Sequence, residues 1–426
     1  MSEADGRGLF AFSDAEALDL AESRSLPCFA YRLDLARSRY DRLRAVLPPR
    51  AILAYAVKAN PGRELARALA SRGAAFDCAS IGELELARSV LGNGGSAPGP
   101  RGSTAGPRSS TAGPRGSPAD PRVLFAGPGK SLEELRLALG MGARIEVDGI
   151  EDLERIEALL SEGRAALAVS VRVHPASGIS EENAIIGGSG PSAFGVDEEE
   201  LSGFLASAAR FKLVRITGLQ VFAASNERSA VRLLANHRAA FAIGERLQRE
   251  TGLPLDLLDL GGGLGIPYAE GEAELDVAAL GAGIGRLIDE NPWFTGKALL
   301  EPGRWIAGPC GVYLARVVRT KRSRGVDFAV LEGGLNHLLR PLLTGQSFPT
   351  ASPRAGQAGE GRVARDSYVA TTLAGPLCTS LDRLGVARLP PLKAGDLVMF
   401  GQAGAYGATE AMKDFLSRPE AREYWF

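Results

Sequence analysis

The sequence alternates between short apolar segments and amphipathic segments at a steady spacing from residue 52 to residue 301. The apolar segments have the length and composition of buried β-strands, and helix-compatible stretches separate them. Eight such units in about 250 residues predict an α/β fold, a (β/α)8 TIM-type barrel whose active site lies at the C-terminal ends of its strands. The predicted strands are Ile52–Val57, Ala75–Cys78, Arg122–Ala126, Ala143–Val147, Leu167–Val173, Ile216–Ala223, Leu257–Leu260 and Ala298–Glu301.

From about Pro309 the alternation stops, and strand-like segments follow one another without helices between them. These predicted strands are Gly311–Arg319, Val326–Leu331, Tyr368–Leu373 and Asp396–Gly401. A chain of 426 residues is also too long for one ordinary domain. We therefore expect a barrel over residues 35–308 and a β-sandwich or β-barrel-like domain built from residues 1–34 and 309–426.

One segment interrupts the barrel pattern. Residues 92–121 are rich in Gly, Pro and Ser, and the hexapeptide Ser-Thr-Ala-Gly-Pro-Arg occurs in them twice. Such a composition buries too little apolar surface to offset the entropy of ordering, so we expect a disordered insertion. The tolerance of such loops favours a repeat expansion, and a segment that binds a partner is the alternative.

Composition excludes several kinds of partner. The net charge is −1 and no basic patch with interleaved aromatic residues occurs, so we expect no nucleic-acid binding. No run of about 18 apolar residues is present, and residues 1–14 do not resemble a signal peptide. The four cysteines and three histidines lack metal-ligand spacing. We expect a cytoplasmic protein with reduced thiols, no bound metal and no membrane contact.

A single lysine ends the first predicted barrel strand. Lys58 follows the apolar run Ile52–Val57, and Asn60-Pro61 then breaks the strand. Taken alone, it is either a solvated lysine at a strand end or a partly desolvated amine that can form a Schiff base.

The octapeptide Ala54–Pro61 resembles the lysine motif of the fold-type III pyridoxal-phosphate (PLP) enzymes, which include alanine racemase and the diaminopimelate and ornithine decarboxylases. The resemblance implies the two-domain architecture of alanine racemase and a PLP cofactor held by Lys58 as an internal aldimine. It also implies that the strand around Phe29 joins the sheet of the second domain.

Further motifs in the same order resemble the cofactor-binding residues of this family. Asp259–Gly265 follows the seventh predicted strand and holds three successive glycines, which let a backbone approach an anion closely. The motif Glu301-Pro302-Gly303-Arg304 begins at the last residue of the eighth predicted strand. A carboxylate beside the pyridine nitrogen keeps it protonated, which favours decarboxylation, whereas the racemases have arginine there. The resemblance assigns the cofactor to Lys58, Phe222, Ser225, Gly261, Gly262, Gly263, Glu301, Arg304 and Tyr406.

Phe222 departs from the family pattern, because most relatives have histidine at this position. A phenylalanine ring still stacks on the cofactor, but it cannot donate a hydrogen bond or a proton. Some decarboxylases of this group that act on unusual substrates share this change.

The segment Gly375–Asp382 resembles the motif that places a catalytic cysteine in the partner subunit's active site, which implies a homodimer with shared active sites. Cys378 would protonate the decarboxylated quinonoid. Diaminopimelate and ornithine decarboxylases follow this cysteine with an acid that meets the substrate's distal ammonium, but here Thr379 follows. A neutral hydroxyl does not compensate a desolvated cation, which argues against a free basic amino acid. By resemblance, Asp382 also contacts substrate.

Arg340 matches the arginine that diaminopimelate decarboxylases use to bind the substrate's distal carboxylate. The tyrosine that follows four residues later in those enzymes is Thr344 here, so only half of that contact is present.

These motifs predict a PLP-dependent carboxy-lyase that acts on an amino acid or on an aminoacyl group tethered to an acyl carrier protein. Lys58 would form the aldimine, and Glu301 would stabilise the quinonoid. The pattern is closest to decarboxylases of secondary metabolism and of exosortase-linked gene clusters. Diaminopimelate decarboxylase, which makes lysine, is the alternative. An amino-acid racemase and a non-catalytic PLP-fold binding protein are further alternatives, and Glu301, Lys58 and Cys378 argue against them.

Overall fold

The computed structural model describes residues 8–92, 121–160, 166–176, 191–252, 254–354 and 367–426. The predicted insertion at residues 92–121 therefore lies almost wholly outside the described residues. The chain divides into two compact units. One holds residues 40–264 and 275–302, and the other holds residues 1–39, 265–274 and 303–426. In the described ranges, no helix is both long enough and apolar enough to cross a lipid bilayer.

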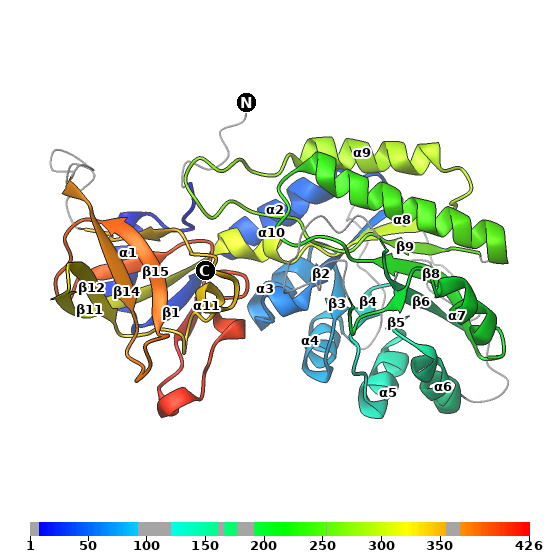
Figure 1. Ribbon diagram of the computed structural model, residues 1–426, viewed down its shortest axis with the longest axis horizontal. Helices are drawn as coiled ribbons and strands as arrows, with labels where there is room; N and C mark the ends of the chain where they lie inside the picture. The colour runs from blue at the N-terminus through cyan, green and yellow to red at the C-terminus, as the bar shows by residue number, and fades with distance from the viewer. Residues whose placement is uncertain (1–7, 93–120, 161–165, 177–190, 253, 355–366) are drawn as a thin grey trace, which may run out of the picture. The chain divides into compact units, whose positions relative to one another are not determined.

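The first unit is a closed parallel barrel (Figure 1). The strands are neighbours in the order β2, β3, β4, β5, β6, β8, β9 and β10, and β10 pairs with β2 to close the ring. Their bounds are Ala51–Ala56, Ala75–Cys78, Val123–Phe125, Arg144–Val147, Leu167–His174, Val214–Val221, Leu257–Asp259 and Lys297–Leu300. The barrel prediction is thus confirmed, with strand ends that differ by a residue or two from those expected. A two-residue strand, β7 (Val196–Asp197), adds to the side of β6.

Helices connect the barrel strands and surround them (Figure 1). They are α2 (Leu33–Val46, which begins in the other unit), α3 (Arg63–Ala70), α4 (Ile81–Leu91), α5 (Leu132–Met141), α6 (Ile150–Leu159), α7 (Leu201–Ala208), α8 (Ala230–Thr251) and α9 (Val277–Glu290). Local sequence signals determine where several of these helices begin and end. Ser131 and Glu134 form a capping box at the start of α5, and Gly142 ends it in the left-handed conformation at φ 68°.

The second unit is built on a mostly antiparallel sheet. Its strands are β1 (Cys28–Tyr31), β11 (Gly311–Ser323), β12 (Val326–Leu331), β13 (Thr350–Ala351), β14 (Val369–Ala374), β15 (Arg383–Leu389), β16 (Leu397–Phe400) and β17 (Arg422–Trp425). β11 is central, because β1, β12 and β16 all pair with it in antiparallel register. Short helices complete the unit: α1 (Asp14–Ser23), α10 (Arg304–Ala307) and α11 (Arg340–Thr344).

The sequence patterns had missed β13, β15 and β17. The segment Arg383–Leu389 alternates between exposed and less exposed side chains, and it contains arginines and a glycine, so no apolar run marks it. β17 lies at the end of the chain and pairs in parallel with β1, a long-range contact that no local pattern encodes.

Candidate active site

Lys58 lies in a short 3-10 turn, Val57–Ala59, that follows β2 directly. Its Nζ atom is 3.2 Å from Oδ2 of Asp77, which belongs to the neighbouring strand β3. The lysine side chain is 44% exposed, whereas the Asp77 side chain is 2% exposed. A buried carboxylate thus holds an amine that remains accessible at the C-terminal end of the barrel.

Phe222 and the glycine run lie at the ends of β8 and β9. The ring centroid of Phe222 is 5.8 Å from Lys58 Nζ. A Cβ atom on Gly261 would lie 2.9 Å from the Phe222 ring, and one on Gly262 would lie 2.5 Å from the carbonyl oxygen of Glu301. Gly263 adopts φ 83°, where a side chain would also meet the backbone of Ala224. Glycine is therefore required at all three positions for these strand ends to pack together.

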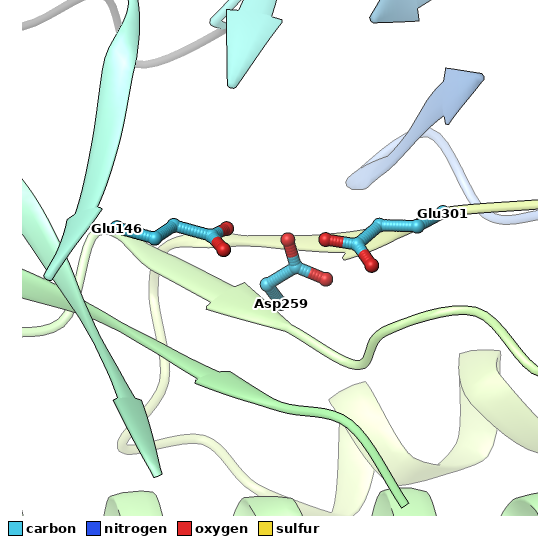
Figure 2. A group of neighbouring side chains, drawn as sticks. All are labelled: Glu146, Asp259 and Glu301. Carbon is cyan, nitrogen blue, oxygen red and sulfur yellow. The ribbon is translucent and has the colours of Figure 1, made fainter. Parts of the chain in front are cut away.

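Glu301 follows β10 and is 3% exposed. The Nε2 group of Gln220, on β8, donates a hydrogen bond to Oε1 of Glu301 at 2.9 Å. Two further buried acids, Glu146 on β5 and Asp259 on β9, point toward it, and Asp259 lies between the other two (Figure 2). Oxygen atoms of the three acids lie within 4.8 Å of one another, a spacing at which carboxyl groups share protons or hold a cation.

This acid cluster is electrostatically costly when all three groups are charged. Burial raises the pKa of Glu146 and of Asp259 well above their usual range, and the neighbouring carboxylates raise both further. Burial also raises the pKa of Glu301, whereas the charge of Lys58 and the hydrogen bonds from Asp259 and Gln220 lower it. The group best placed to be ionised is therefore Glu301.

Asp259 is the group best placed to hold a proton. Its Oδ1 atom accepts the backbone N–H of Gly261 at 2.8 Å, and its Oδ2 atom has no hydrogen-bond donor among the described residues. A proton on its carboxyl group makes Asp259 a donor to Glu301, and this hydrogen bond raises the pKa of Asp259. The cluster thus links the acid at the end of β10 to the glycine run after β9.

In the second unit, Arg304 starts α10 and lies against two tyrosines. Its Nη1 group donates to the hydroxyl of Tyr268 at 2.8 Å. Its guanidinium lies 4.8 Å from the ring centroid of Tyr406, a residue with the left-handed φ of 56°. A non-glycine residue in this region of backbone conformation is uncommon and is found at binding sites more often than elsewhere.

Arg340, at the start of α11, also lies against Tyr406, at 4.7 Å from the ring centroid. Its Nη1 group donates to both carboxylate oxygens of Glu410, at 2.9 and 2.8 Å. The sequence analysis had assigned no role to Glu410. The hydroxyl of Thr344 donates to the Arg340 carbonyl within the helix.

Cys378 is exposed, on the loop between β14 and β15. The loop is held by Asp382, whose carboxylate accepts the backbone N–H groups of Leu335 and Leu377, each at 2.7 Å. Thr379 is partly buried, and its hydroxyl accepts the N–H of Leu381 at 3.2 Å. Asp382, which the resemblance assigned to substrate binding, therefore stabilises the conformation of this loop.

The predicted residues fall into two sets. Those that the barrel unit holds are Lys58, Phe222, Ser225, Gly261, Gly262, Gly263 and Glu301. Those that the second unit holds are Arg304, Arg340, Cys378, Thr379, Asp382 and Tyr406. Sequence reasoning missed the supporting residues Asp77, Glu146, Gln220 and Asp259, although a polar residue within an otherwise apolar predicted strand was an available signal.

Residues 33–308 match the family model for the pyridoxal-binding domain of pyridoxal-dependent decarboxylases. The chain is 32% identical over 411 residues to the diaminopimelate decarboxylase of Deinococcus radiodurans, covering 95% of this chain and 91% of that protein. It is 27% identical over 412 residues to the L-glutamyl-(BtrI acyl-carrier protein) decarboxylase of Niallia circulans, covering 95% and 90%.

The fold is similar to that of a solved diaminopimelate decarboxylase from Helicobacter pylori, complexed with L-lysine. The TM-score is 0.79 at 23% sequence identity, and the match covers 96% of this chain and 93% of the other.

Proposed function

This chain belongs to the pyridoxal-dependent decarboxylases, and from that premise we propose that it removes the α-carboxylate of an amino acid, or of an aminoacyl group tethered to a carrier protein, whose distal end carries no positive charge. As a member of this family it is a carboxy-lyase that uses PLP. The observation that carries the proposal is the buried carboxyl pair Glu301–Asp259 at the strand ends that surround Lys58.

The barrel residues fit the cofactor. Lys58 offers a primary amine, and the Phe222 ring lies beside it. The Oδ1 atom of Asp77 and the Oε1 atom of Gln220 are buried and have no hydrogen-bond partner among the described residues, so the strand ends contain polar atoms that a ligand can satisfy. Among these groups, Glu301 is the acid suited to a protonated ring nitrogen.

When bound, PLP supplies an electron sink for the electron pair that the departing carboxylate leaves behind. We assign Lys58 Nζ to binding the cofactor's aldehyde carbon, and Glu301 to the ring nitrogen. Gln220 and Asp259 orient the Glu301 carboxylate by their hydrogen bonds, so that its charge is fixed in one direction. By resemblance, the phosphate is bound by the glycines of 261–263 with Ser225, Arg304 and Tyr406.

The overall reaction breaks the bond between Cα and the carboxylate, releases CO2 and adds one proton to Cα. Two groups of this chain can supply that proton, the thiol of Cys378 and the ammonium of Lys58. Cys378 is exposed on a loop that Asp382 anchors, which suits a group that acts on a ligand. As in the related decarboxylases, we propose that a homodimer shares its active sites and that each subunit provides Cys378 to its partner.

The substrate proposal rests on Thr379 and on one relative. A hydroxyl at position 379 offers no countercharge to a distal ammonium group, and buried cations are costly without one. The relative from Niallia circulans is named for a glutamyl group on a carrier protein, which has no such ammonium. Arg340 favours a second candidate, diaminopimelate decarboxylation, because an arginine can bind the distal carboxylate of that substrate.

The test is release of CO2 from substrates labelled at the α-carboxyl carbon, with the PLP-loaded protein. We expect labelled CO2 from at least one amino acid or carrier-bound aminoacyl group. We also expect its loss in Lys58→Ala, together with loss of the absorption band of lysine-bound PLP. Racemisation of a single-enantiomer sample without CO2 release would contradict the proposal.

A further inference from the structure

Arg340 and Glu410 form an ion pair within the second unit, and the arginine is more deeply buried than the glutamate. The Arg340 side chain is 3% exposed and the Glu410 side chain is 29% exposed. Both oxygens of Glu410 accept from Nη1 of Arg340, at 2.9 and 2.8 Å. The guanidinium keeps an Nε–H group without any acceptor among the described residues.

This pairing neutralises the charge that a substrate carboxylate would otherwise meet. A distal carboxylate that bound Arg340 as its sole cation would have to displace Glu410. The displaced glutamate would then sit in a largely covered position without a counterion, which is unfavourable. A carboxylate that accepted instead from the N–H groups that Arg340 does not use for Glu410 would place two negative charges beside one cation, and they would repel each other. An uncharged carbonyl oxygen accepts from the same N–H groups without this repulsion.

Tyr406 links this pair to Arg304, which the family resemblance assigns to the cofactor's phosphate. Its ring lies under the guanidinium of Arg340 and also under that of Arg304, and Tyr406 is only four positions before Glu410 in the chain. The left-handed backbone of Tyr406 is the kind of strain that a binding site retains. Glu410 reaches Arg340 from this strained segment, across 70 positions of sequence.

We propose that Glu410 is a specificity-determining residue, which makes Arg340 select a substrate whose distal end is an uncharged carbonyl group and reject one with a free distal carboxylate. The inference rests on the proposed function. It narrows the substrate class to amino acids whose distal carboxyl group is bound in an ester, a thioester or an amide. An aminoacyl group attached to its carrier through the distal carbonyl has this chemistry.

The test compares two pairs of matched probes on the PLP-loaded protein. Monomethyl glutarate and glutarate have no amino group, so calorimetric titration measures their binding without any reaction. The γ-methyl ester of L-glutamate and L-glutamate itself differ in the same way, and CO2 release measures their turnover. The variants are Glu410→Gln, which keeps the shape of the side chain, and Glu410→Ala. Glu420→Gln is the control, since Glu420 is an exposed glutamate paired with Lys413 at 3.4 Å.

In the wild type and in Glu420→Gln, monomethyl glutarate should bind more tightly than glutarate. In both Glu410 variants, the ratio of the two dissociation constants should shift toward glutarate by about tenfold or more, the size expected when a carboxylate gains a charged hydrogen bond. A substitution that merely loosened the fold would weaken the binding of both probes equally and leave the ratio of their dissociation constants unchanged.

An unchanged ratio in both Glu410 variants overturns the inference, even if the enzyme decarboxylates the glutamate ester. Failure of monomethyl glutarate to bind the wild type overturns it as well. If the ratio shifts in the Glu410 variants alone but neither the glutamate probes nor any carrier-bound aminoacyl group loses CO2, the inferred selectivity stands and the proposed function fails.

Discussion

The side-chain amide of Gln220 donates a hydrogen bond to the carboxylate of Glu301 at 2.9 Å, and it joins the strand β8 to the end of β10. The donor is neutral, so it orients the carboxylate without neutralising its charge. Gln220 also lies two positions before Phe222, so one strand end positions both the acid and the aromatic ring. The orientation of Glu301 is thus fixed by the barrel itself.

Replacing Gln220 with leucine should remove this orientation and leave the fold intact. A hydrogen bond to a charged group is worth about 1.5–3 kcal/mol, so we expect kcat/KM to fall by about tenfold to a hundredfold. The pH dependence of the absorption spectrum of bound PLP should shift with it. Gln248→Leu is the control, because Gln248 bonds the Trp293 carbonyl from the outer helix α8. Equal effects of the two substitutions would exclude a specific role for Gln220.

Asp259 should keep its proton to a higher pH than a free aspartic acid does, because its pKa is raised by burial and by the neighbouring carboxylates. Since its pKa is raised in the folded protein from 3.8, its contribution to stability is fully present below pH 3.8 and is lost as the pH rises through the raised value. Asp259→Asn keeps the acceptor for Gly261 and a donor for Glu301, and it removes this dependence. We expect similar melting temperatures at low pH, and a smaller fall for the variant than for the wild type as the pH rises.

Asp259→Leu provides the comparison, because it removes both hydrogen bonds and leaves the N–H of Gly261 unpaired. We expect it to destabilise the protein by about 1–3 kcal/mol at every pH. Parallel curves of melting temperature against pH for the wild type and Asp259→Asn would show that Asp259 is already ionised.

The barrel could be predicted from sequence because each of its strands is a short apolar run that a helical segment follows. Val123–Phe125 and Leu257–Asp259 are only three residues long in the structure. In the sequence, each is still recognisable as part of an apolar run that contrasts with the amphipathic helical segments. β15 could not be predicted in the same way. Its two arginines and its glycine are compatible with a loop, and it becomes a strand only because β14 offers it a partner.

The site was predictable only where residues form a local motif. Lys58, the glycines of 261–263 and Glu301 each sit within a few residues of a strand end. The buried acids Glu146 and Asp259 come from separate strands, and nothing local shows that their carboxyl groups lie within 4.8 Å of each other and of Glu301. The pair of Arg340 and Glu410 depends likewise on how α11 packs against a short 3-10 helix that lies 70 positions later in the chain.

Thiol labelling of the native protein should modify Cys378 alone. The other three cysteines are buried, and burial raises the pKa of Cys28 and of Cys310 to about 12 and that of Cys78 well above its usual range. Since the thiolate is the reactive form, these three should react only on unfolding. Cys378→Ser should abolish labelling of the folded protein. Persistent labelling in that variant would show that another cysteine is accessible.

The proposed shared active site predicts complementation between two inactive variants. Lys58→Ala lacks the cofactor lysine, and Cys378→Ala lacks the thiol. If each site draws on both subunits, a mixed dimer has one intact site, so mixing and exchanging the two variants should restore part of the activity. No recovery, although mass measurements show that mixed dimers have formed, would place both residues in a site within one subunit.

The most direct test of the account is a competition experiment read by mass spectrometry. The PLP-loaded protein would be incubated with meso-diaminopimelate and with a carrier protein loaded with a glutamyl group through its distal carbonyl. The account predicts that the carrier-bound group loses the mass of CO2 while diaminopimelate remains. Conversion of diaminopimelate to lysine with the carrier-bound group unchanged would contradict it, and would show that neither Thr379 nor Glu410 excludes a substrate with charged distal groups.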